Sequence, residues 1–258
     1  MIKGKKGLVF GIANDHSIAW GIAEKLHLNG AQLAITYQNS TLLKRVKPLA
    51  DKVDCDCLIE CDLGKEEDIN NSLKIVKDKF GKIDFIIHAV AYSDKNELNG
   101  RYIETSKYNF INSLSISCFS FTKIAKVFQP IINENGSLVT LSFYGANKVM
   151  PNYNVMGVAK AALETSVKYL SVDLGSQNIR VNAISSGPMR TLSGAAISNA
   201  REVYKFAQNN SALKRSVGLN EIGNSAIYLT SDLSSAVTGE VLYVDCGYNI
   251  IGMPSVNY

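Results

Sequence analysis

Two side chains that could act on a developing negative charge, Tyr153 and Lys160, are seven positions apart in the sequence. Seven helical steps of about 100° bring a side chain nearly back to its starting direction, so the phenol and the ammonium would share one helix face. A proton-donating phenol would then lie near a fixed positive charge. An isolated pair at this spacing is usually a half-buried aromatic and a solvated lysine, so its interpretation depends on the rest of the chain.

The composition is that of a globular enzyme, with 46% hydrophobic and 19% charged residues in 258. Because no linker-like run or repeat divides the chain, we expect a single domain covering residues 1–258. The net charge of +4 comes from scattered residues, which argues against a nucleic-acid partner. The chain also lacks a secretory signal and an apolar run long enough to cross a membrane, so a cytoplasmic location is expected.

Cysteines and histidines give no sign of a metal site. The five cysteines are odd in number and lack paired CxxC spacing, and the three histidines are far apart. We therefore expect reduced thiols, no metal and no Ser-His-Asp arrangement. His88 is expected to be a packed or capping residue rather than a base or a ligand.

Short apolar runs alternate with helix-length segments along the whole chain. Near-continuous apolar strands separated by helices predict an α/β fold, a single doubly wound Rossmann-type domain with a seven-stranded parallel sheet flanked by helices. Ligands bind beyond the carboxyl ends of the strands in such folds. The predicted strands are residues 7–10, 32–36, 57–61, 85–88, 137–141, 180–184 and 241–244.

The end of the first predicted strand is suited to a diphosphate. Gly11 leaves the strand, a loop follows, and Ser17 is expected to cap a helix that starts at Ile18. Gly11 would let the backbone approach a ligand closely, and the helix N-terminus would favour its negative charge. The segment lacks the full GxGxxG pattern, so an ordinary turn remains the alternative.

The residues after the second and third strands bear on the choice of cofactor. Gln38 occupies the position where Rossmann proteins usually have an acidic residue that holds the adenosine ribose. Gln38 can hydrogen-bond a ribose hydroxyl, and the nearest basic residues, Lys44 and Arg45, lie a turn or more into the next helix. NADH is therefore favoured over NADPH. Asp62 is either a contact for the adenine amino group or an unremarkable loop residue.

Taken together, these motifs resemble the bacterial enoyl-acyl-carrier-protein reductases of the NAD-dependent, short-chain dehydrogenase/reductase type, over essentially the whole chain. The most specific segments are residues 11–21, 151–157 with Lys160, and 180–191. Ordinary members of the wider superfamily have three residues between their Tyr and Lys. This chain has six, as this reductase family does.

The resemblance implies reduction of the 2,3 double bond of a trans-2-enoyl group on acyl carrier protein with NADH, in fatty acid elongation. Hydride addition to the β-carbon moves negative charge onto the thioester oxygen, and Tyr153 would donate a hydrogen bond there. Lys160 would hold the nicotinamide ribose hydroxyls and supply positive potential.

The resemblance also implies the remaining contacts and partners. Ser93 would touch the substrate, residues 191–207 would form a mobile substrate-binding loop, and the protein would be a homotetramer. Acyl carrier protein would deliver the enoyl group. The residues expected to line the cofactor are Gly11, Ser17, Ile18, Gln38, Asp62, Leu63, Val90, Lys160, Met189, Arg190, Thr191, Leu192 and Ser193.

One position departs from the family pattern. The family usually has a second active-site tyrosine ten residues before the first, and this chain has Phe143 there, followed by Tyr144. Tyr144 could replace the missing phenol only if the backbone is irregular, because adjacent side chains of a strand point to opposite faces. Two alternatives stay open: another short-chain dehydrogenase/reductase acting on a carbonyl, or a catalytically weakened cofactor-binding homologue.

Overall fold

The computed structural model describes residues 1–195 and 200–253. Within these residues, seven strands pair in parallel in one sheet of order β3-β2-β1-β4-β5-β6-β7. The predicted doubly wound, seven-stranded sheet is confirmed. The strands are β1 (Lys6–Phe10), β2 (Gln32–Tyr37), β3 (Cys57–Glu60), β4 (Ile83–His88), β5 (Ile132–Phe143), β6 (Arg180–Ser186) and β7 (Val241–Val244).

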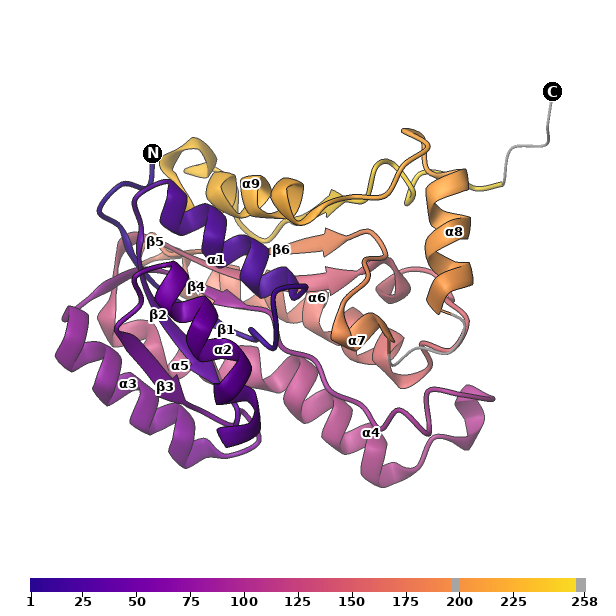
Figure 1. Ribbon diagram of the computed structural model, residues 1–258, viewed down its shortest axis with the longest axis horizontal. Helices are drawn as coiled ribbons and strands as arrows, with labels where there is room; N and C mark the ends of the chain where they lie inside the picture. Colours follow the sequence, from indigo (N-terminus) through magenta and orange to yellow (C-terminus); the bar gives the residue numbers. More distant parts are fainter. Residues whose placement is uncertain (196–199, 254–258) are drawn as a thin grey trace.

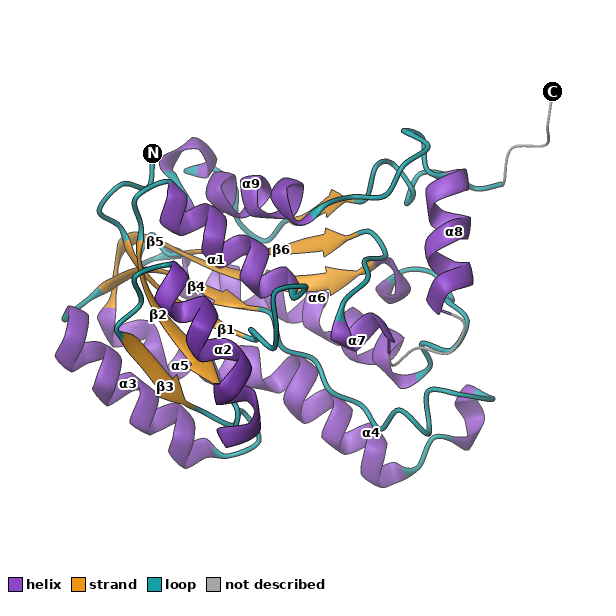
Figure 2. Cartoon of the chain, viewed as in Figure 1, coloured by secondary structure: helices purple, strands orange, loops and turns teal. Residues whose placement is uncertain are grey.

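Helices cover both faces of the sheet (Figures 1 and 2). The helices are α1 (Ile18–Leu28), α2 (Ser40–Lys52), α3 (Glu66–Phe80), α4 (Lys107–Leu114), α5 (Ser120–Phe128), α6 (Val155–Gly175), α7 (Leu192–Ala195), α8 (Ala200–Asn210) and α9 (Leu219–Thr230). A π-helical segment, η2 (Ser115–Phe119), joins α4 to α5, and a 3₁₀ turn, η4 (Tyr144–Ala146), follows β5. None of the described helices is both long and apolar enough to cross a membrane.

Two apolar cores explain why the strands are apolar along their whole length. Val9 of β1 packs in one core with α1, α2 and α9, whereas its neighbours Leu8 and Phe10 pack in the other with α3, α5 and α6. Successive side chains of a strand alternate between the two faces, and here both faces are covered by helices. The continuous apolar runs are therefore the consequence of a sheet that has no solvated face.

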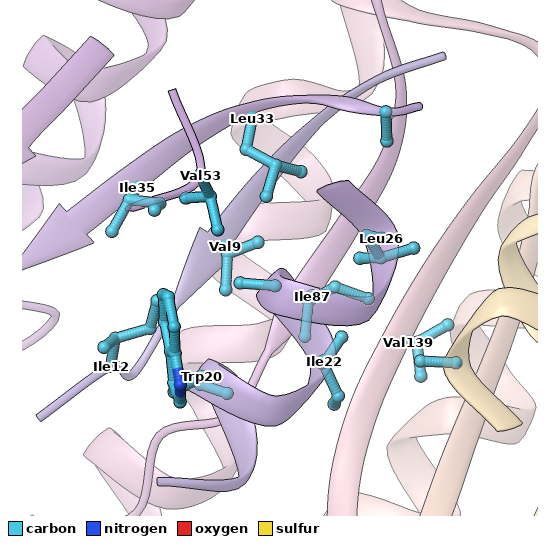
Figure 3. Packing of buried hydrophobic residues seen from close by; sticks show 14 of the residues in the cluster. Val9, Ile12, Trp20, Ile22, Leu26, Leu33, Ile35, Val53, Ile87 and Val139 are labelled. Atoms are coloured by element: carbon cyan, nitrogen blue, oxygen red, sulfur yellow. The ribbon is translucent and has the colours of Figure 1, made fainter. Parts of the chain in front are cut away.

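Helix α1 is anchored firmly on the sheet. Figure 3 shows Trp20, Ile22 and Leu26 of α1 facing Val9 of β1 and Ile87 of β4, and all five side chains are buried. Burial of each such side chain contributes about 1.5–3 kcal/mol. The start of α1 is thereby fixed beside the carboxyl ends of β1 and β4.

Strand boundaries differ from the predictions where the sequence pattern is interrupted. β5 begins at Ile132, five residues before the predicted start, and its register with β4 shifts between Ile83 and Phe85. The polar stretch before residue 137, in which Asn135 has a φ of 66°, gives no apolar signal although it continues the strand. β3 ends at Glu60, so Cys61 lies just beyond it.

The carboxyl ends of the parallel strands meet at one edge of the sheet. In Figure 1, α7 and α8 lie at the edge toward which β5 and β6 run. Helix α6 packs against β5 and β6 and begins near the same edge. This edge therefore brings together the loops that carry the predicted site residues.

Candidate active site

A cavity of about 360 Å³ opens at the carboxyl edge of the sheet. Its walls come from the β1–α1 loop, the segments after β4 and β6, the end of β5, the start of α6, and helices α7 and α8. The predicted site residues that line it are Gly11, Ser17, Ile18, Val90, Ser93, Phe143, Tyr153, Lys160, Met189, Thr191 and Leu192.

Tyr153 and Lys160 both face this cavity, but not as two residues of one helix. Tyr153 lies in the turn before α6, which begins at Val155, so the helical-spacing argument is wrong in detail although the two side chains do converge. Tyr153 is 8% exposed and Lys160 is 5% exposed. Burial raises the pKa of the Tyr153 phenol above its ordinary value, with a contribution from Glu164, so the phenol keeps its proton.

Lys160 is held by the strand beside it. Its Nζ donates a hydrogen bond of 2.7 Å to the backbone oxygen of Leu141 in β5. Burial lowers the pKa of Lys160 to about 8, and the nearby Cys118 and Glu164 oppose that shift. Lys160 is therefore a cation at neutral pH, although its pKa lies well below that of an exposed lysine.

A glycine lies directly beside the Tyr153 ring. A Cβ on Gly145, in the η4 turn, would come within 2.4 Å of the Tyr153 ring, so any larger residue would displace the ring. On another side, Phe143 packs edge-on against Tyr153, with ring centroids 5.0 Å apart and the planes at 69°. Gly145 and Phe143 together fix the direction of the phenol.

Tyr144 does not line the cavity. The backbone turns into η4 at this residue, and the Tyr144 ring packs 5.6 Å from Tyr248 and 6.5 Å from Tyr243, as measured between centroids. Phe143 lines the cavity instead. The backbone at Tyr144 is irregular, as a replacement of the missing family phenol by Tyr144 would require. However, this irregular backbone directs the Tyr144 ring into a cluster with Tyr243 and Tyr248 and not into the cavity.

The β1–α1 loop is organised differently from the prediction. Ser17 precedes α1, but its hydroxyl accepts hydrogen bonds from the amides of Ala13 (3.0 Å) and Asn14 (2.9 Å) rather than capping the helix. Because Ser17 holds the loop, the first amides of α1 remain available for an anionic group. Gly11 has a φ of 104°, and a Cβ there would lie 2.2 Å from the oxygen of Ala89, so only glycine fits.

The residues predicted to contact adenosine lie outside the cavity, after neighbouring strands of the same sheet. Gln38 is exposed directly after β2, and Asn39 caps α2 by accepting from the amides of Thr41 and Leu42. Asp62 follows β3 and accepts a hydrogen bond from the amide of Gly64. Leu63 is partly buried against the apolar core that contains α3.

The segment after β6 forms another side of the cavity. Met189, Thr191 and Leu192 line the cavity, whereas Arg190 faces an adjoining hollow that also borders Arg201 and Lys205. Residues 196–199 of the predicted substrate-binding loop, and the side chain of Ser193, lie outside the described residues.

His88 at the end of β4 and Ser93 after it lie in different surroundings. Ser93 lines the cavity and its hydroxyl exchanges hydrogen bonds with the side-chain amide of Asn109, at 3.1 and 3.3 Å. His88 is fully buried, with ring nitrogens 2.8 Å from Thr140 Oγ1 and 2.9 Å from Ser120 Oγ. Burial lowers the pKa of His88 to about 3, so it is a neutral packed residue, as predicted.

Two polar residues of the cavity, and a carboxylate hydrogen-bonded to one of them, were not identified individually from the sequence. Ser142 lines the cavity and donates a hydrogen bond to Glu164, which lies one helical turn after Lys160. That i, i+4 spacing from Lys160 is a signal that could have identified Glu164. Tyr204 of α8 also lines the cavity, and its hydroxyl is buried with no hydrogen-bond partner among the described residues.

The described ranges 1–195 and 200–253 contain no set of side chains that could bind a metal ion. No group of three or more His, Cys, Asp or Glu residues there is arranged to hold a metal ion. The five cysteines, all within these ranges, are free thiols.

Comparisons with known proteins cover nearly the whole chain. The sequence model of the family described as "Enoyl-(Acyl carrier protein) reductase" matches residues 11–249. "Enoyl-[acyl-carrier-protein] reductase [NADH] 2" of Rhizobium meliloti is 54% identical over 99% of this chain and 96% of its own. The Rickettsia typhi enzyme named "Enoyl-[acyl-carrier-protein] reductase [NADH] FabI" is 50% identical, over 98% of this chain and 97% of its own.

A solved structure agrees with these matches. The crystal structure of the enoyl-acyl-carrier-protein reductase of Anaplasma phagocytophilum in complex with NAD superposes with a TM-score of 0.95 at 50% identity, covering 99% of this chain and 96% of the other. The sheet order, the cavity at its carboxyl edge and these sequence matches agree with one another. The chain belongs to the enoyl-(acyl carrier protein) reductase family.

Proposed function

We propose that this protein reduces the 2,3 double bond of a trans-2-enoyl group on acyl carrier protein with NADH, in fatty acid elongation. The observation that carries the proposal is the convergence of a protonated phenol, Tyr153, and a buried cation, Lys160, on one mostly apolar cavity. An apolar cavity suits an acyl chain, and the two polar groups suit the thioester end.

Tyr153 acts on the charge that the reaction creates. Bound NADH supplies the hydride, and addition to the β-carbon places negative charge on the thioester oxygen. The Tyr153 hydroxyl donates a hydrogen bond to that oxygen, and the raised pKa keeps the donor protonated. Gly145 and Phe143 hold the ring in its direction before substrate arrives, so little reorganisation is needed.

Lys160 holds the cofactor and contributes positive potential. Its hydrogen bond to Leu141 fixes the ammonium at the cavity wall. From there Lys160 would hold the ribose hydroxyls of a bound nicotinamide. A positive charge in a site screened from water favours enolate formation more than the same charge in solution.

The residues present fit NADH. The start of α1 offers helix amides to the diphosphate, Gly11 permits close approach, and Gln38 follows β2 at the ribose position. We expect NADH to give a higher kcat/KM than NADPH in side-by-side kinetics. A clear preference for NADPH would mean that Lys44 or Arg45 reaches the 2′-phosphate and that the interpretation of this strand end is wrong.

Acyl carrier protein is the proposed donor of the substrate. Arg190, Arg201 and Lys205 border a hollow that shares Pro188, Met189 and Tyr204 with the cavity. Positive charge beside the entrance suits an anionic carrier with a phosphate-bearing prosthetic arm. Free thiols at all five cysteines, each a described residue, are consistent with the cytoplasmic location that we propose.

The proposed assembly is a homotetramer. Large apolar side chains are exposed on the outer surface of α4, η2 and α6, among them Tyr108, Phe119, Tyr169 and Val172. Exposed apolar surface of this kind is typical of subunit interfaces. Light scattering after size-exclusion chromatography should give four times the chain mass of 28.1 kDa, and a monomer would contradict the proposal.

One assay separates the candidate activities. NADH oxidation is followed with a crotonyl thioester and, in parallel, with a ketone substrate. Turnover of the thioester alone supports the enoyl reductase, and turnover of the ketone indicates a carbonyl reductase of the wider superfamily. Binding of NADH without turnover of either would support the weakened cofactor-binding homologue.

A further inference from the structure

Two side chains of opposite charge on helix α6 form hydrogen bonds with the end of β5. Lys160 donates to the Leu141 oxygen at 2.7 Å, and Glu164, one turn later, accepts from the hydroxyl of the next residue, Ser142, at 2.6 Å. Glu164 is only 9% exposed. A buried carboxylate is costly unless its oxygens are hydrogen-bonded, so this position is a specialised one.

The second oxygen of Glu164 holds the other end of the η4 turn. Oε2 accepts from the side-chain amide of Asn147 at 3.0 Å, and the same amide donates to the Tyr243 hydroxyl at 2.9 Å. Ser142 precedes η4 and Asn147 follows it, and Gly145 between them packs against the Tyr153 ring. One carboxylate therefore holds both sides of the turn that supports the phenol.

The charge of Glu164 also bears on Lys160. The titratable groups near Lys160 include Tyr153 in the same cavity, His88 of β4, Cys118 of η2 and Glu164 of its own helix. His88 is neutral near pH 7 because its pKa is about 3. Burial raises the pKa values of the Tyr153 and Tyr243 phenols, and the nearby Glu164 adds to both shifts. Burial lowers the pKa of Lys160, and Cys118 and then Glu164 oppose this shift.

We infer that Glu164 is a positioning residue of the reductase site, which holds the η4 turn under Tyr153 and places a carboxyl group one helical turn from Lys160. The inference rests on the proposed function for its effect on turnover, but its effect on NADH binding does not require turnover. Glu164 joins both sides of η4 to the helix that carries Lys160.

Three variants separate the charge of Glu164 from its hydrogen bonds. Glu164→Gln keeps the length and removes the charge, Glu164→Asp keeps the charge and shortens the side chain, and Glu134→Gln makes the same chemical change at an exposed position of β5. For each, the dissociation constant of NADH is measured by fluorescence from pH 6 to 10, and kcat by NADH oxidation with a crotonyl thioester.

The parent should bind NADH more weakly as pH rises through the pKa of Lys160, because the ammonium is lost. In Glu164→Gln this transition should move to lower pH by about one unit, the size of shift that a nearby opposite charge produces. Glu164→Asp should keep the parental transition but lower kcat by about tenfold, as expected for a misplaced Tyr153. Glu134→Gln should behave as the parent. If the pH at which NADH binding weakens is the same in Glu164→Gln as in the parent, Glu164 has only a structural role and the inference is wrong.

Lys160→Arg tests the assignment independently, including the case in which Glu164→Gln fails to fold. An arginine stays charged throughout this pH range, so the transition in NADH binding should disappear. Its persistence would assign the transition to another group and contradict the inference. If the parent binds NADH with the expected pH dependence but does not reduce the thioester, the proposed function fails while the link between Glu164 and Lys160 stands.

Discussion

The cavity wall formed by β5 and α6 is a buried polar network, whereas the wall formed by α7 and α8 is largely exposed. Lys160 of the first wall is 5% exposed and its neighbour Glu164 is 9% exposed, whereas Leu192 of the second wall is 50% exposed. We call β5 with α6 the inner wall of the cavity, and α7 with α8 the outer wall. The inner wall carries the groups that act on the reacting atoms.

The difference has a physical reason. Groups that stabilise charge in a transition state must be fixed before the reaction, which requires burial and hydrogen bonds. A wall that only encloses the acyl chain does not act on the charge that develops and has no such requirement. Substitutions in the inner wall should therefore lower kcat, whereas those in the outer wall should mainly change KM.

The largest effect is expected for Tyr153→Phe. Loss of the hydroxyl should lower kcat on enoyl thioesters by roughly 10²–10³-fold, because it removes one donor to the developing oxyanion. The dissociation constant of NADH should stay within about twofold of the parental value, since the hydroxyl acts mainly in the transition state. Steady-state kinetics and a fluorescence titration measure the two quantities. An unchanged kcat would remove Tyr153 from the mechanism.

Lys160→Ala should affect both cofactor binding and turnover. Removal of the ammonium should weaken NADH binding by about tenfold and lower kcat by a similar factor, because Lys160 both holds the ribose and supplies positive potential. The same two measurements apply. Unchanged values of both would show that Lys160 is only a support for Leu141.

A matched pair of glycine substitutions tests the two walls directly. Gly145→Ala should lower kcat by about tenfold because its Cβ would lie 2.4 Å from the Tyr153 ring. Gly194→Ala, whose Cβ would lie 2.3 Å from the Tyr204 hydroxyl in the outer wall, should mainly raise KM. Thermal unfolding of both variants controls for loss of the fold. A fall in kcat for Gly194→Ala larger than that for Gly145→Ala would contradict the division of roles.

The smallest effect is expected for Phe143→Tyr. If the family's second phenol helps only to place the substrate, restoring it should change kcat/KM by less than about tenfold, or about 1.4 kcal/mol of barrier. Tyr144→Phe is the control, and it should be near neutral because Tyr144 packs against Tyr248 away from the cavity. A rise of several orders of magnitude in Phe143→Tyr would identify the parent as a degenerate reductase.

The sequence predicted the parts of the fold that have a local signal. The predictions placed the apolar runs of β1, β2 and β4 correctly, because a strand that is buried on both faces has apolar residues at successive positions. They also placed the start of α1 at Ile18. The early start of β5 was missed because its first residues are polar. The helical alignment of Tyr153 with Lys160 was also wrong in detail, because α6 begins only at Val155.

By itself, the sequence determined the chemical groups and the sheet that brings them to one edge, because residue types and apolar periodicity are local properties. Only the tertiary structure decided which way Tyr144 points, that Ser17 holds a loop instead of capping α1, and that Glu164 joins both sides of η4 to the helix of Lys160. Each of these depends on a hydrogen bond or a ring contact set by packing, often between distant residues. The spacing of residues along the chain does not encode such contacts.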